Sequence, residues 1–181
     1  MFKRYSIHSV LIPGSGYGRN SKLFSENNFN VVGIEISDIA FEMAKKFDPK
    51  TKFFNGSVLE MPFTDKKYDA IYCFNTLHLF LRKERIKFLT NCYNQLRGNG
   101  FVFFTMFSEK EISFENGKEI EKNTFESKPG RPTHYFTKND LIQHFEDYHI
   151  VKTGFMEDQE NHGKIGFHIH KLRYIFAQKR V

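Results

Sequence analysis

The first half of the chain alternates short apolar runs with stretches in which apolar residues recur at helical spacing. The apolar runs predict five β-strands, at residues 9–13, 30–36, 52–58, 68–74 and 101–107. The helical spacing predicts three helices between them, at residues 19–26, 38–47 and 82–96. On the second of these helices, Met43, Ala44 and Phe47 share a face that we expect to pack inward. This alternation predicts an α/β doubly wound sheet.

The second half of the chain is less regular. Residues 108–133 are polar with little periodicity, which predicts a long loop. Residues 137–140 have the composition of a capping box, so we expect a helix to follow. Apolar residues return near 148–155 and 171–178 and predict two closing strands. We find no repeat and expect a single domain over residues 1–181.

Composition and charge narrow the class of protein. Hydrophobic residues make up 40% and charged residues 27% of the chain, as in ordinary globular proteins. No apolar run is long enough to cross a bilayer, and the N-terminus lacks the hydrophobic stretch of a signal peptide. We therefore expect a cytoplasmic protein without a membrane partner, in which Cys73 and Cys92 are buried free thiols. The net charge of +6 is scattered along the chain, which favours a solvated surface over a nucleic-acid partner.

A glycine-rich turn follows the first predicted strand. Gly14, Gly16 and Gly18 lie between that strand and the next helix, where the absence of a Cβ lets a ligand approach the backbone. Glu35 ends the second strand, 21 residues after Gly14. A carboxylate there can accept hydrogen bonds from both ribose hydroxyls of an adenosine. The pattern therefore predicts an adenosine-containing ligand.

The spacing of the glycines distinguishes between adenosine ligands. Dinucleotide enzymes use G-x-G-x-x-G, with the pyrophosphate at the helix N-terminus. Here the third glycine, Gly18, comes one residue early. That spacing is the one that S-adenosylmethionine enzymes use. We interpret the turn as a site for S-adenosylmethionine or its product; a dinucleotide site and a purely structural turn are the alternatives.

Two segments carry a family resemblance. Residues 10–20 and 31–37 resemble class I S-adenosylmethionine-dependent methyltransferases, most of all the tellurite-resistance and thiopurine/thiol methyltransferase groups. The resemblance covers most of the chain and is strongest in the first 110 residues. It implies a Rossmann-like, mostly parallel seven-stranded sheet whose last strand is antiparallel.

The resemblance also implies roles for individual residues. The residues implied to bind the cofactor are Gly14, Ser15, Gly16, Gly18, Asn20, Glu35, Ile36, Ser57, Val58, Phe74 and Asn75. His78 is implied to lie beneath the reacting methyl group. Two positions depart from the family: Ser15 stands where many members have Cys, and Ser57 where Asp is common. A hydroxyl can still accept the adenine amino hydrogen.

For the methyl acceptor, the resemblance implies a small molecule with a soft nucleophile such as a thiol or a chalcogen. His162 matches a histidine that faces the methyl group in tellurite-resistance enzymes, so His162 and His78 are the catalytic candidates. The arginine expected next is Gly163, which argues against an oxyanion substrate. Residues 74–77 lack the Asn/Asp-Pro-Pro-aromatic motif of enzymes that methylate exocyclic amines of nucleic acids.

Two further features bear on function. His168 and His170 are two apart and would share a face of a strand, but no cysteine lies nearby, and we predict no metal site.

Relatives carry a helical lid before the first strand, which begins here within ten residues of Met1. We expect a naturally open site, a site covered by a second copy or another partner, or a truncated chain. A non-catalytic binding module and an RNA or protein methyltransferase are the alternative functions.

Overall fold

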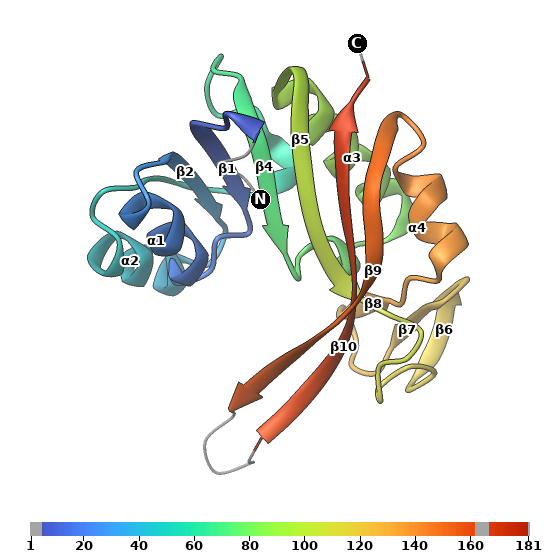
Figure 1. Cartoon of the computed structure of the whole chain (residues 1–181). Coiled ribbons are helices and arrows are strands. Elements are labelled where there is room, and N and C mark those ends of the chain that lie inside the picture. Colours follow the sequence, from blue (N-terminus) through green and yellow to red (C-terminus); the bar gives the residue numbers. More distant parts are fainter. Residues whose placement is uncertain (1–4, 162–166, 181) are drawn as a thin grey trace.

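The structure is a computed structural model that describes residues 5–161 and 167–180. Seven strands form one sheet (Figure 1): β1 (Ser9–Pro13), β2 (Asn30–Glu35), β3 (Lys52–Asn55), β4 (Tyr68–Phe74), β5 (Leu96–Phe107), β9 (Tyr148–Asn161) and β10 (Phe167–Lys179). Their spatial order is β3-β2-β1-β4-β5-β10-β9. The first five strands pair in parallel, and β10 pairs antiparallel with both neighbours. The predicted fold class is confirmed.

Four α-helices accompany the sheet: α1 (Arg19–Glu26), α2 (Asp38–Phe47), α3 (Arg82–Gln95) and α4 (Lys138–His144). Successive side chains of a strand point to opposite faces, so the apolar run of β1 contributes to two cores. Val10 and Ile12 pack in one cluster with Phe24 of α1, whereas Leu11 joins the cluster that contains Phe88 of α3. None of the described helices is long and apolar enough to cross a membrane.

The face predicted for the second helix is only partly right. Ala44 is fully buried, as expected, but Met43 and Phe47 are largely exposed. Ala44 lies against the loop after β1, where its Cα is 3.2 Å from the position that a Cβ on Gly18 would take. The helix therefore packs most closely through its small residue, while Phe47, although exposed, still contacts the ring of Tyr17 with the centres 6.1 Å apart.

The segment predicted as a long loop contains a second sheet. Strands β6 (Lys118–Glu121), β7 (Thr124–Glu126) and β8 (Pro132–His134) pair antiparallel in that order. Asn123 adopts a positive φ of 58° and makes the tight turn between β6 and β7. The strands are three or four residues long, and Thr124 and His134 are buried polar residues, so hydrophobic periodicity did not reveal them.

The last two strands are longer than predicted and form a projecting arm. The pairing of β10 with β5 begins at Leu172, opposite Phe107, whereas residues 167–171 pair with β9. In Figure 1, the ends of β9 and β10 extend beyond the sheet as a two-stranded ribbon. Many residues of this ribbon are polar, and the ladder of backbone hydrogen bonds continues where the apolar pattern has ended.

The two cysteines behave as predicted. Cys73 and Cys92 are free thiols with fully buried side chains in the same core cluster. Burial raises the pKa of the Cys73 thiol to about 12 and raises that of Cys92 as well. Both are therefore unreactive packing residues.

Candidate functional site

The glycine-rich turn is fixed between the ends of β2 and β4. The backbone amides of Gly14 and Ser15 both donate to the carbonyl oxygen of Ile34, at 2.9 Å. Gly14 has a φ of +72°, and a Cβ there would lie 2.2 Å from Oγ1 of Thr76. Packing of the turn against the segment after β4 therefore requires a glycine at this position.

Gly16 has a different reason to be glycine. Its φ is +56°, and a Cβ built on it would meet nothing within 4 Å. The backbone around Gly16 thus borders open space in which a ligand can lie against the main chain. This open side at the second glycine fits the predicted cofactor, whose methionine end approaches the turn.

Glu35 faces this open space from the end of β2. Its Oε2 accepts a hydrogen bond from the amide of Gly16 and its Oε1 one from the amide of Ser37, both at 2.8 Å. A carboxylate has about four acceptor positions, so these two bonds orient it and leave capacity for both hydroxyls of a ribose. The side chain is half-buried at the edge of the turn.

The other predicted cofactor residues near β1, β2 and β3 differ in whether their side chains are exposed to a ligand or occupied in the fold. Ile36 is 68% exposed beside Glu35, as a surface for an adenine ring would be. Ser15 is buried, and its hydroxyl donates to Ile34, so only its backbone borders the turn. Ser57 caps a short 3₁₀ helix by accepting from the amide of Leu59 at 3.2 Å. The side chain of Val58 is buried in the core.

At the end of β4, Asn75 is held by β5. Asn75 has a φ of +53°, and its backbone N–H donates to the carbonyl oxygen of Thr105 at 3.1 Å. The Thr105 hydroxyl in turn donates to Oδ1 of Asn75 at 2.9 Å. Thr105 was not predicted as a site residue, although it is the one polar residue in the apolar run over 101–107. Beside Asn75, the guanidinium of Arg19 lies 5.6 Å from the ring centre of Phe74.

His78 lies in a buried aromatic environment. Its ring stacks on that of Phe107, with the centres 4.1 Å apart and the planes 11° apart. Burial, helped by the nearby His170 and His134, lowers the pKa of His78 to about 3, so the ring is neutral at physiological pH. Its Nδ1 is buried and has no hydrogen-bond partner among the described residues.

The predicted residues therefore gather at one edge of the sheet. Glu35 is the last residue of β2, and Gly16, Ser57 and Asn75 follow β1, β3 and β4. These strands are parallel, so their carboxyl ends meet at the same edge. Ligands of open α/β sheets bind at this edge. Asn20 is half-buried in the first turn of α1, which begins at Arg19 directly after Gly18. His162 lies outside the described residues.

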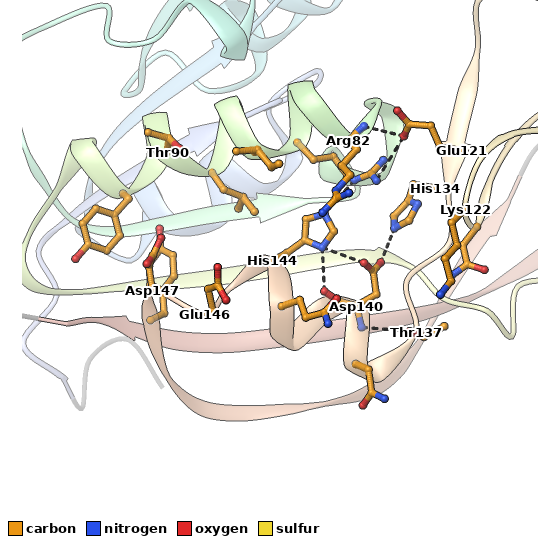
Figure 2. Close-up of a pocket in the computed structure, with 18 residues that line it drawn as sticks. Arg82, Thr90, Glu121, Lys122, His134, Thr137, Asp140, His144, Glu146 and Asp147 are labelled. Atoms are coloured by element: carbon orange, nitrogen blue, oxygen red, sulfur yellow. Dashed lines mark hydrogen bonds and ion pairs between the residues drawn. The ribbon is translucent and has the colours of Figure 1, made fainter.

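A groove of about 1170 Å³ lies elsewhere, between α3, α4 and the turn from β6 to β7. Its polar side chains bond to one another: Arg85 donates to His144 at 3.2 Å. Asp140 is paired with both His144 and His134 (Figure 2). Burial raises the pKa of Asp140, but hydrogen bonds from the two histidines outweigh it and lower the pKa overall. The groove contains none of the predicted site residues, and its internally paired groups indicate a structural role.

Comparison with known proteins identifies the family and the cofactor. A family model described as a methyltransferase domain matches residues 11–104, more than half of the chain. A solved S-adenosylmethionine-dependent methyltransferase from Methanosarcina mazei superposes with a TM-score of 0.84 at 18% identity, over 99% of this chain and 97% of that one. Magnesium protoporphyrin IX methyltransferase from Synechocystis, solved with bound S-adenosylhomocysteine, superposes with a TM-score of 0.71 at 17% identity, over 94% of this chain and 73% of that one.

Two further similarities concern proteins with named activities. TehB from Haemophilus influenzae superposes with a TM-score of 0.72 at 16% identity, over 99% of this chain and 60% of that chain. The tRNA N(3)-methylcytidine methyltransferase Mettl2 of Drosophila melanogaster is 27% identical over 128 residues, 65% of this chain. The chain spans between 9% and 51% of the length of three curated relatives that it matches. The matching domain model, the doubly wound sheet and the open glycine turn facing Glu35 agree with one another. The chain therefore belongs to the class I S-adenosylmethionine-dependent methyltransferases.

Proposed function

We propose that this methyltransferase acts on a small molecule and methylates a soft nucleophile, a thiol or a chalcogen. The observation that carries the proposal is the neutral, buried His78 stacked on Phe107. A ring with so low a pKa is a poor general base, whereas the half-buried Phe107 that stacks on it offers an aromatic surface for a nucleophile that needs placement more than proton transfer.

Arg173 also favours this class over an oxyanion. It is buried on β10, and its Nε donates to Oε2 of Glu109 and to the carbonyl oxygen of Phe136, each at 2.8 Å. A second ion pair joins the same guanidinium to Glu109. These contacts occupy the side chain in holding β10 to the segment after β5. The likeness to TehB supports placing the chain with the tellurite-resistance group.

In the proposed reaction, S-adenosylmethionine supplies an electrophilic methyl group on a sulfonium. Glu35 would hold the ribose hydroxyls, and the backbone at Gly16 would lie against the methionine end. Ile36 and Ser57 would border the adenine, and Asn75, fixed by Thr105, would position the methionine end under the turn. The acceptor sulfur would form a bond to the methyl carbon as the bond to the sulfonium breaks. The thiol proton would leave to solvent.

The test is a two-step measurement on the purified chain. Calorimetry should show S-adenosylmethionine binding that Gly16→Val abolishes, because a valine would fill the open side of the turn. A panel of small thiols and selenols is then assayed by release of S-adenosylhomocysteine. Turnover of at least one soft acceptor by wild type, and none by Gly16→Val, is the expected result. Binding without turnover of any acceptor would replace the proposal with that of a non-catalytic binding module.

A second candidate acceptor is RNA. The net charge of +6 and the similarity to a tRNA methyltransferase favour it, because a basic surface attracts the phosphate backbone. The same assay discriminates between a small-molecule acceptor and RNA. Release of S-adenosylhomocysteine with transfer RNA, but with none of the small acceptors, would make RNA the better-supported acceptor.

A further inference from the structure

Three side chains that are distant in sequence converge beside the end of β5. Glu111 lies in the segment after β5, and His168 and His170 lie on β10, 57 and 59 residues further along. Oε1 of Glu111 is 3.1 Å from Nδ1 of His170 and 3.3 Å from Nε2 of His168. The Glu111 side chain is buried, and the two histidines are partly exposed.

The backbone explains why this cluster is formed in advance. Where β5 ends, the amide of Ser108 still donates to the carbonyl oxygen of Lys171, at 3.1 Å. The chain then turns, and the amide of Glu111 donates back to Ser108 at 3.0 Å. Oε2 of Glu111 accepts a hydrogen bond from the backbone amide of Lys171 at 2.6 Å. The carboxylate thus takes the place of the backbone carbonyl that a neighbouring strand would offer to β10. The carboxylate is thus fixed between two histidines that share one face of β10.

The geometry points to a metal site. One ligand atom from each of the three side chains lies within 4.8 Å of the other two. Zinc bonds to nitrogen and carboxylate oxygen are about 2.0–2.1 Å long, so neighbouring ligand atoms of a tetrahedral zinc are about 3.3 Å apart. The two contacts to Glu111 match that separation. Two histidines and one carboxylate also form a ligand set that leaves a coordination position open.

We propose that Glu111, His168 and His170 bind a divalent transition-metal ion, with zinc as the reference ion, next to the acceptor side of the methyl-transfer site. The ring of His170 lies 4.9 Å from that of Phe107, which also stacks on His78. The side chain of His168 is 37% exposed, so the site can be reached from solvent. Spacing along the sequence shows only two histidines; the fold adds the third ligand.

The metal site deepens the proposed function, and this step rests on it. A thiol that takes the open coordination position loses its proton to solvent and is held as a thiolate. Its sulfur keeps a lone pair for the methyl carbon. The metal would therefore supply the deprotonation that neutral His78 does not.

The test uses the whole chain, Zn²⁺ alone and Co²⁺ alone as probes. Calorimetry should show one Zn²⁺ per chain, and Co²⁺ should give the visible absorption of a four-coordinate ion. Glu111→Gln keeps an acceptor for Lys171 but removes the anionic ligand. It should weaken Zn²⁺ binding by at least about 100-fold, since loss of an outer-shell partner alone costs 10- to 100-fold. His149→Gln, at an exposed histidine of β9 outside the cluster, is the matched control and should bind like wild type.

His168→Gln guards against a folding defect, because that side chain is the most exposed of the three. It should keep the native circular dichroism spectrum and S-adenosylmethionine affinity while losing Zn²⁺ affinity. Wild type without Zn²⁺ binding, or either variant with unchanged binding, would overturn the proposal and leave the cluster as a hydrogen-bonded brace of β10.

The metal site and the proposed acceptor can fail separately. Adding a thiol to the Co²⁺ form should produce a sulfur-to-cobalt charge-transfer band. Metal binding without that band refutes the coordination of the thiol to the metal, and metal binding without thiol turnover refutes the thiol acceptor; neither result refutes the site. Thiol turnover by a chain that binds no metal refutes the site but not the acceptor.

Discussion

Single residues decide how the turn after β1 works, and its glycines do so for different reasons. Gly14 is required by Thr76, whereas Gly16 leaves the space that a ligand needs. From sequence, both were predicted to serve ligand approach. The contact with Thr76 could not be foreseen, because it joins residues 62 positions apart that only the parallel pairing of β1 and β4 brings together.

At Glu35, substitution should weaken cofactor binding without unfolding the chain. Glu35→Ala removes the acceptor of two backbone amides and, in the proposed cofactor site, of the ribose hydroxyls. We expect S-adenosylmethionine affinity to fall by about 1–3 kcal/mol in calorimetry, the value of charge-assisted hydrogen bonds. Glu42→Ala, at an exposed carboxylate of α2, is the control. Equal affinities of the two variants would refute the ribose assignment.

His78 should make the apoprotein sensitive to acid. Its pKa is about 3 in the fold and about 6.5 when unfolded, so the unfolded state binds more protons between these values. Stability is therefore complete above pH 6.5 and falls as the pH drops towards 3. At pH 5 the loss from this group is about 2 kcal/mol. Urea unfolding at pH 7 and pH 5 should show a smaller difference for His78→Gln than for wild type or His149→Gln.

At the scale of elements, the central strands β1, β4 and β5 were predictable because they are apolar runs that are largely buried. The small sheet of β6, β7 and β8 was not, because its strands are short and its inward residues include Thr124 and His134. Those two side chains bond to each other at 2.8 Å. A polar network therefore fixes this element where apolar periodicity is missing.

The same network connects the small sheet to α4 through Asp140. Asp140→Ala would leave Nε2 of His134 without its carboxylate partner, whereas Nδ1 of His144 would keep the backbone carbonyl oxygen of residue 140, at 2.9 Å. An unsatisfied buried group costs about 1–3 kcal/mol, and we expect the free energy of unfolding to fall by about that amount. Asp147→Ala, at an exposed aspartate on the rim of the same groove, should change it little. Equal unfolding midpoints in urea would contradict the structural role of the groove.

Across the whole molecule, charge should produce weak and unspecific nucleic-acid binding if the acceptor is a small molecule. The net charge of +6 is scattered, so association with transfer RNA should be salt-dependent and disappear near physiological ionic strength. Fluorescence anisotropy with transfer RNA and with an unrelated duplex, at two salt concentrations, measures this. A tight complex with transfer RNA alone at physiological salt would instead support the RNA alternative.

The sequence allowed the fold class and the cofactor edge to be predicted, since both depend on local pattern: strand periodicity, glycine spacing and a carboxylate at a strand end. The acceptor side depends on contacts between distant segments. Phe107, Glu111 and His170 meet only because β10 returns beside β5. No spacing rule connects them, so the proposed acceptor side became visible only in three dimensions.

The position of β10 also sets the order in which the molecule can be completed. β9 is synthesised before β10, yet β10 separates it from β5. Until residues 172–178 have emerged from the ribosome, the edge of β5 from Phe101 to Phe107 has no native partner. An unpaired apolar edge is a template for pairing with other chains. Nascent chains shorter than this should therefore depend on chaperones, and the synthesis of β10 should end this dependence.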